Sequence, residues 1–115
     1  MRRGDIYWVD LDPALGAEAN KTRPAVVVSN DAANRAAGRG GRGVVTVVPI
    51  TSNTTRVYPF QVLLPAKDCG LGSDSKAQAE QVRTVAAARL RSRIGALPPA
   101  VLKQLDEALR LHLSL

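Results

Sequence analysis

Short apolar runs separated by polar turns follow one another along most of the chain. Most of these runs contain β-branched residues and are too short for helices, so they predict strands. Val44–Ile50 is broken only by Thr46, which favours a central strand. The predicted strands are Asp5–Leu11, Pro24–Val28, Val44–Ile50 and Phe60–Leu64, and Lys76–Val85 predicts one further strand or a strand pair.

Helical spacing is clearest at the C-terminal end. Pro98-Pro99 suits a first helical turn, and Val101, Leu105, Ala108 and His112 then recur at helical intervals. Leu102, Leu109 and Leu113 widen this apolar stripe. His112 falls near the stripe, which favours a packed or interfacial histidine over a catalytic one.

Two shorter helices are also predicted. Asp31–Ala37 suits one helical turn with Asp31 as its cap, and Ala86–Arg91 suits a short helix. Strands nevertheless dominate the pattern. The prediction is therefore an α+β fold, mainly β, with a curved antiparallel sheet and a C-terminal helix.

Length and composition narrow this picture. The 115 residues predict a single domain, 1–115, and only 3% of them are aromatic, so the core must consist of Val, Leu, Ile and Ala. The net charge is +6 with a pI near 10.3, which favours a polyanionic partner, although an acidic protein would satisfy it as well as a nucleic acid.

The residues available for chemistry exclude several classes of site. One cysteine, Cys69, and one histidine, His112, make neither a zinc site nor a redox centre, and the ten acidic residues are scattered. The glycine-arginine tract Gly38–Gly43 lacks a phosphate-binding motif and is equally compatible with RNA contact or simple solvation. No apolar leader is visible at the N-terminus, so we expect a cytoplasmic protein.

Several segments, taken in order, closely resemble the MazF/PemK/Kid family of toxins from toxin-antitoxin systems. These segments are Gly4–Pro13, Gly16–Glu18, Arg23–Ser29, Val48–Asn53, Tyr58–Leu64 and Asp74–Thr84. Together they span nearly the whole chain. The resemblance implies a small twisted, SH3-like β-barrel of the MazF/CcdB type, a homodimer, and a sequence-specific endoribonuclease that cuts single-stranded RNA without metal or other cofactor. It also implies an acidic antitoxin partner.

The resemblance also implies roles for individual residues. Arg23 and Thr51 match the pair usually given the catalytic role, and Glu18 matches a loop acid implicated in activity. Residues assigned by the same resemblance to RNA binding are Lys21, Ser52, Asn53, Ser75, Glu80, Gln81 and Arg83. Trp8 and Tyr58 could stack on bases, but with so few aromatics we expect them in the core or at a dimer interface.

Two other functions remain open at this point. A CcdB-like poison of DNA gyrase would share the fold, but such proteins act through a C-terminal tail containing tryptophan, and this chain ends His112-Leu113-Ser114-Leu115. A passive RNA-binding module would need only the basic charge, and would bind without turnover.

Overall fold

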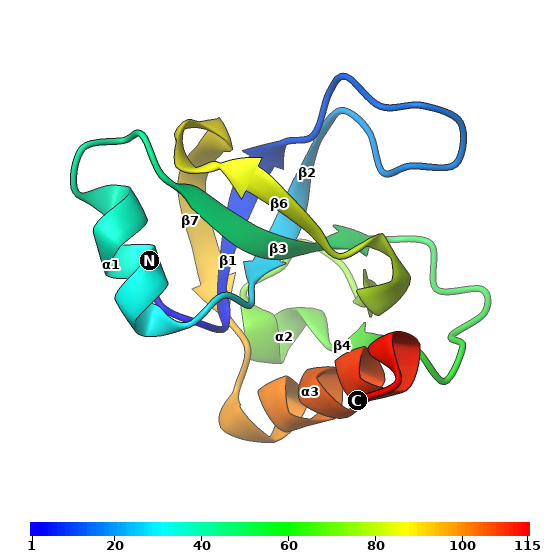
Figure 1. Cartoon of the computed structure of the whole chain (residues 1–115). Coiled ribbons are helices and arrows are strands. Elements are labelled where there is room, and N and C mark those ends of the chain that lie inside the picture. Colours follow the sequence, from blue (N-terminus) through cyan, green and yellow to red (C-terminus); the bar gives the residue numbers. More distant parts are fainter.

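The computed structural model describes all 115 residues and is built around one sheet of seven strands (Figure 1). The strands are β1 (Asp5–Asp10), β2 (Thr22–Val27), β3 (Val44–Thr51), β4 (Gln61–Leu64), β5 (Ser75–Gln78), β6 (Arg83–Ala86) and β7 (Leu90–Ala96). The helices are α1 (Asp31–Gly38), α2 (Ala66–Cys69) and α3 (Pro99–Leu113), with 3-10 turns η1 (Ala79–Gln81) and η2 (Ala87–Arg89). The predicted α+β fold with a C-terminal helix is confirmed.

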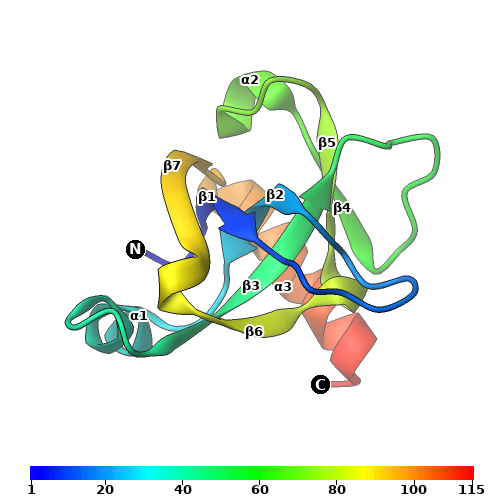
Figure 2. The ribbon, with the colours of Figure 1, turned by 90° about the horizontal axis from the view of Figure 1, so that it is seen from above.

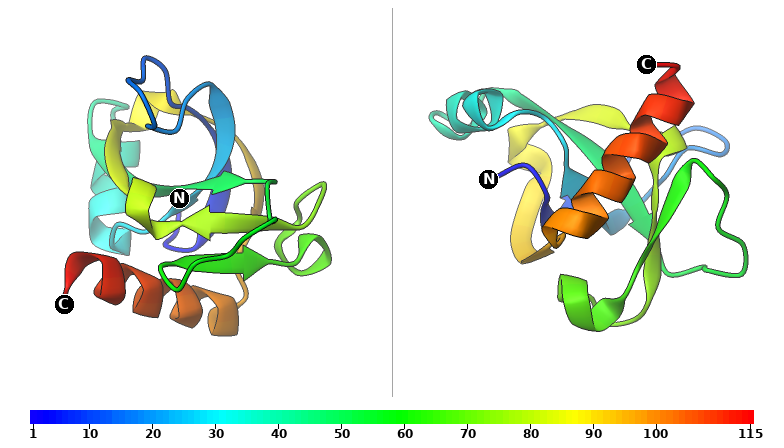
Figure 3. Two further views of the ribbon diagram at one scale, coloured as in Figure 1. Left: turned by 90° about the vertical axis from the view of Figure 1, so that its right-hand side faces the viewer. Right: turned by 90° about the horizontal axis from the view of Figure 1, so that it is seen from below.

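Every strand pair is antiparallel, and β3 is the central strand. The strand order is β4-β5-β3-β2-β1-β7, with β6 paired to β3. The first half of β3, Val44–Val47, pairs with β6, whereas Ile50 and Thr51 at its end pair with β5. Because β3 pairs with β6 along its first half and with β5 at its end, the sheet curls into a partial barrel (Figure 3).

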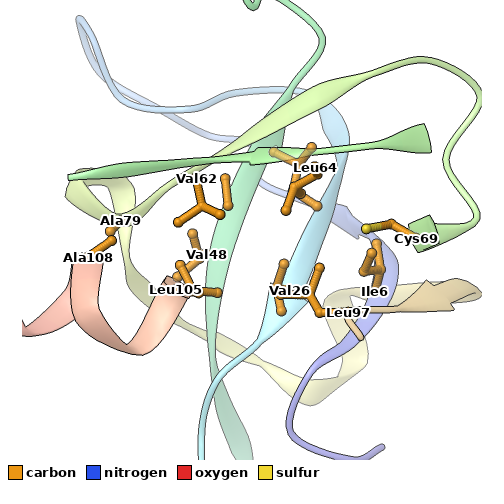
Figure 4. Close-up of a cluster of buried hydrophobic side chains, with 12 residues drawn as sticks. Ile6, Val26, Val48, Val62, Leu64, Cys69, Ala79, Leu97, Leu105 and Ala108 are labelled. Carbon is orange, nitrogen blue, oxygen red and sulfur yellow. The ribbon is translucent and has the colours of Figure 1, made fainter. Parts of the chain in front are cut away.

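Two apolar clusters lie on opposite faces of β2 and β3. Val26 and Val48 are cross-strand partners in the first cluster, which α2 and α3 cover (Figure 4). Ala25, Val27 and Val47 belong to the second cluster, inside the barrel. Successive side chains of a strand point to opposite faces, so a strand buried on both faces must be apolar throughout. This explains the continuous apolar runs in the sequence.

Helix α3 confirms the predicted stripe only in part. Leu105 and Ala108 are buried against the first cluster, as their spacing indicates. His112, however, is exposed in this chain, so the expectation that it packs within the chain was wrong. The reason is that residues 110–115, at the end of α3, are all exposed. None of the helices has the length and apolar character that a membrane span requires.

The prediction of a short helix over Ala86–Arg91 was wrong. This segment forms the turn η2 and then enters β7, which pairs with β1. Strand β7 lies at the edge of the sheet and exposes Arg91, Ser92 and Arg93, so it lacks apolar alternation. Pairing with β1 outweighs the high helix propensity of this alanine-rich segment.

A close approach of α2 to β7 also depends on tertiary contact. Gly70 follows α2 in the left-handed conformation, with φ of 80°, and its N–H donates to Ala66 O at 3.0 Å. Opposite it, Gly95 of β7 lies so near that a Cβ there would be 2.2 Å from the carbonyl oxygen of Cys69. The two glycines let the backbones of α2 and β7 meet.

The cap of α1 was misassigned by one residue. Asn30, not Asp31, precedes the helix, and its side-chain oxygen accepts from Ala33 N at 2.8 Å. Asp31 lies in the first turn and accepts from Arg3 N at 2.7 Å, which ties α1 to the N-terminus. Both residue types suit this end of a helix, so sequence alone does not separate them.

Candidate functional site

Two loops project from the same side of the molecule, away from α1 (Figures 1 and 2). They are the β1–β2 loop, residues 11–21, and the β3–β4 loop, residues 52–60. Two adjoining cavities lie where these loops leave the sheet. The start of β2 and the end of β3 therefore bring polar side chains to one place.

The larger cavity measures about 350 Å³ and is floored by Ile50. Its polar contributors from the sequence prediction are Arg23, Ser52 and Ser75. The Ser75 hydroxyl is buried and already donates to Ser73 O at 2.9 Å. Ser52, by contrast, is exposed and hydrogen-bonds with no other residue through its side chain.

The smaller cavity measures about 180 Å³ and lies under the β1–β2 loop. It brings together four of the predicted site residues, Glu18, Arg23, Thr51 and Gln81. They come from a loop, two strands and a turn, and the sequence positions span residues 18 to 81. The three residues predicted to be catalytic therefore line one cavity.

Arg23 is the one predicted site residue that borders both cavities. Its side chain is half-buried, and it hydrogen-bonds only with Asn20: Nε donates to the backbone oxygen at 2.8 Å and a terminal nitrogen donates to Oδ1 at 3.2 Å. No acidic group forms an ion pair with it. The guanidinium charge is therefore held in place but not neutralised.

Thr51 and Glu18 flank this charge. Thr51 is the last residue of β3, and its hydroxyl oxygen accepts from Asn53 N at 3.2 Å. The exposed Glu18 accepts from Leu15 N at 3.0 Å through one carboxylate oxygen, and the other oxygen has no partner. Each group keeps hydrogen-bonding capacity for a ligand.

The remaining predicted RNA-binding residues line neither cavity. Glu80 accepts from Gln61 at 2.6 Å, and Arg83 donates to Leu11 O at 3.1 Å. The amide oxygen of Asn53 accepts from Thr55 N at 3.2 Å, within the β3–β4 loop. Lys21 is exposed at the end of the β1–β2 loop, in a left-handed conformation with φ of 63°.

Sequence reasoning missed several residues of the two cavities. Trp8 lines the larger cavity with 41% of its surface exposed, so it is not a core residue, and its place at a dimer interface stays a prediction. Gln78 lines the smaller one, and Asn20 is the only hydrogen-bonding partner of the Arg23 side chain. The spacing of Asn20 and Arg23, three residues apart before a strand, was the available signal.

Tyr58 is also outside the core and organises the β3–β4 loop instead. Its ring stacks on Phe60 at a centroid distance of 5.3 Å, and its hydroxyl accepts from Arg56 at 3.2 Å. Lys76 of β5, although largely buried, donates to Arg56 O at 2.6 Å and lies 5.9 Å from the centre of the Tyr58 ring. The loop beside the larger cavity is thus internally braced.

The other reactive groups lie apart from the cavities. Burial raises the pKa of the Cys69 thiol, and the neighbouring Asp68 carboxylate adds to this effect. Cys69 faces the first apolar cluster (Figure 4). No three residues among the histidine, cysteine and acidic residues gather as a metal-binding group would.

Comparisons with known proteins agree with this geometry. Residues 2–113 match the family described as PemK-like, MazF-like toxin of type II toxin-antitoxin system. The chain is 65% identical to Endoribonuclease MazF9 of Mycobacterium tuberculosis, covering 100% of this chain and 98% of that protein. It is 34% identical to Endoribonuclease EndoA of Bacillus subtilis, covering 100% and 96% of the two chains.

Solved structures give the same result for the fold. The crystal structure of MazF from Deinococcus radiodurans superposes with a TM-score of 0.82 at 28% identity, covering 100% of this chain and 97% of that one. A mycobacterial endoribonuclease in complex with its cognate antitoxin superposes with a TM-score of 0.79 at 26% identity, covering 100% and 96%.

Proposed function

This chain belongs to the PemK-like, MazF-like family of type II toxins, and we propose that it cleaves single-stranded RNA at the two cavities that meet at Arg23. The whole-length match to proteins named endoribonucleases supports the nuclease over a gyrase poison on the same fold. The sequence-based prediction of a toxin endoribonuclease is confirmed at the level of the family.

One observation carries the assignment of the site. Arg23 holds an unneutralised charge between the two cavities, fixed by the neutral oxygens of Asn20. A preorganised guanidinium that lacks an acidic partner suits the negative oxygens of a phosphate. An RNA strand that runs across Arg23 would place one of its phosphates between the two cavities.

The residues of the smaller cavity suit a reaction in which the ribose 2′-OH attacks the adjacent phosphate. Glu18 takes the 2′-OH proton as that oxygen forms a bond to phosphorus, and the bond from phosphorus to the 5′-oxygen breaks. Arg23 stabilises the charge that develops on the phosphoryl oxygens. Thr51 orients the phosphate, and its hydroxyl gives a proton to the leaving 5′-oxygen while it takes one from solvent. The products are a 2′,3′-cyclic phosphate and a 5′-hydroxyl.

The larger cavity supplies a place for a neighbouring base. Trp8 presents an exposed ring there, and Ile50, Leu71 and Ile94 make its wall partly apolar. Unstacked bases bind proteins by stacking on aromatic rings and by hydrogen bonds to their edges. Ser52 is free to make such a hydrogen bond. This cavity would give the enzyme its sequence preference on one side of the cut.

A homodimer and an antitoxin complete the proposal. Leu111, Leu113 and Leu115 leave apolar surface exposed at the end of α3 and just beyond it, as in a chain that pairs with a copy of itself. The related mycobacterial endoribonuclease was solved with its cognate antitoxin, and the charge of +6 suits an acidic segment lying over the cavities. Its RNA substrate places the enzyme in the cytoplasm. Sedimentation as a monomer at micromolar concentration would contradict the dimer.

The decisive experiment uses RNA with defined sugars. Total RNA is first digested in EDTA, and the 5′ ends are sequenced to find the cut. An oligonucleotide containing that site should be cleaved, whereas the same oligonucleotide with deoxyribose 5′ of the cut should not. Cutting of the deoxy substrate, or a 5′-phosphate product, would make water the nucleophile. Gyrase-dependent DNA breakage without RNA cleavage would favour the poison, and binding without turnover a passive module.

A further inference from the structure

The β1–β2 loop carries Glu18, and a single side chain hydrogen-bonds its middle to the rest of the protein. The carboxamide of Gln81, in η1, accepts from Ala19 N at 3.0 Å and donates to Ala17 O at 2.9 Å. These two backbone groups lie on either side of Glu18. More than sixty residues separate Gln81 from them in the sequence.

No other hydrogen bond ties this part of the loop down. Arg83 donates to Leu11 O and Arg89 donates to Asp12 O, but both contacts are at the base of the loop. Among residues 13–19, the remaining hydrogen bonds join Leu15 with Glu18 inside the loop itself. Beside the packing of Ala19 against the second apolar cluster, Gln81 therefore makes the only hydrogen bonds that hold the backbone around Glu18 to the rest of the protein.

We propose that Gln81 is a positioning residue, whose carboxamide fixes the backbone around Glu18 and so sets this carboxylate over the cavity that Arg23 and Thr51 line. The inference rests on the proposed function and replaces the RNA-binding role that sequence resemblance implied for Gln81. Only a group with one donor and one acceptor side by side can pair with an N–H and a carbonyl in this way.

Substitutions of Gln81 can remove both of its hydrogen bonds or its donor alone. Gln81→Met keeps the length and removes both hydrogen bonds. Gln81→Glu keeps an acceptor for Ala19 N, but its ionised form has no proton to donate to Ala17 O. When that carboxyl is protonated, near pH 4.5, the donor returns. Gln104→Glu, on an exposed face of α3, makes the same charge change away from the site.

The first measurement is hydrogen exchange in the free protein, without RNA. The Ala19 amide should exchange about tenfold faster in Gln81→Met than in the wild type, because its acceptor is gone. Unchanged exchange would contradict the positioning role of Gln81, whether or not the protein is a nuclease. This readout separates failure of the inference from failure of the proposed function.

The second measurement is cleavage of the mapped RNA site. At neutral pH, Gln81→Met and Gln81→Glu should lower kcat about tenfold with little change in KM. Relative to wild type, Gln81→Glu should recover as the pH falls, while Gln104→Glu should match wild type throughout. Glu18 and Arg23 share the cavity and are present in every variant, so each variant is compared with wild type at the same pH.

A double mutant completes the test. If Gln81 acts through Glu18, adding Gln81→Met to Glu18→Gln should change kcat much less than it does alone. Additive losses, or a rise in KM with kcat preserved, would show that Gln81 contacts RNA directly and would overturn the proposal. If Glu18→Gln is fully active, the base assigned in the proposed function is wrong. The hydrogen-exchange result still shows whether Gln81 holds the loop backbone.

Discussion

Arg23 donates two hydrogen bonds to Asn20, one to its backbone oxygen and one to its side-chain oxygen. The two residues lie three positions apart, where the β1–β2 loop enters β2. Neutral acceptors orient the guanidinium without cancelling its charge. An acidic residue at position 20 would hold Arg23 as well but would compete with the phosphate.

This contact predicts an order of effects at position 20. Asn20→Asp should lower kcat more than Asn20→Ala, because a carboxylate neutralises Arg23 whereas alanine keeps the backbone acceptor. We expect roughly a tenfold loss for alanine and up to about a hundredfold for aspartate. Single-turnover cleavage of the mapped RNA site measures both. The reverse order would contradict the proposed role of the Arg23 charge.

The catalytic assignments predict different losses at Arg23 and Thr51. Arg23→Ala should lower turnover at least about a hundredfold, as loss of one transition-state donor does, with a smaller effect on RNA affinity. Thr51→Ala should have a milder effect, and Thr51→Ser, which keeps the hydroxyl, should be close to wild type. Kinetics together with RNA binding at fixed salt test this. If Arg23→Ala weakened binding and turnover equally, Arg23 would be a binding residue only.

The approach of α2 to β7 predicts a large loss of stability at Gly95. A Cβ at this position would lie 2.2 Å from Cys69 O, so Gly95→Ala must push the two backbones apart. We expect the free energy of unfolding in urea to fall by about 1–3 kcal/mol or more. Gly72→Ala is the matched control, because a Cβ there meets nothing within 4 Å. Equal stability of the two variants would argue against this packing.

The buried Cys69 thiol predicts a specific dependence of stability on pH. Because its pKa is raised in the folded state, the thiol is protonated in both states below about pH 8.5. Above that pH the unfolded chain loses the proton while the folded chain keeps it, so stability falls as pH rises. Urea unfolding between pH 8 and 10 should therefore show a steeper loss for wild type than for Cys69→Ala. Parallel slopes would contradict the raised pKa.

Much of the site was predictable because its residues come from segments with a distinctive local order. Arg23 lies at the start of β2, just before its buried apolar residues, and Thr51 ends β3, so both were placed at strand ends from the sequence. Asn20 was not assigned, and Trp8 was expected in the core or at a dimer interface, because nothing in their local sequence shows which cavity they face. Gln81 was recognised as part of the site, but its partner backbone lies in a loop more than sixty residues away.

The fold class, the buried strands β2 and β3, the C-terminal helix and the family could all be predicted from the amino-acid order. Apolar periodicity and the order of motifs can be recognised in the sequence without knowledge of the contacts between distant residues. Contacts between distant segments were needed to show that residues 90–96 form β7, and that Glu18, Arg23 and Thr51 share a cavity. The exposed arginines of β7 carry no apolar pattern, and pairing with β1 fixes that strand. The cavity likewise exists only because antiparallel pairing brings separate strand ends together, where Gln81 can hold the loop above them.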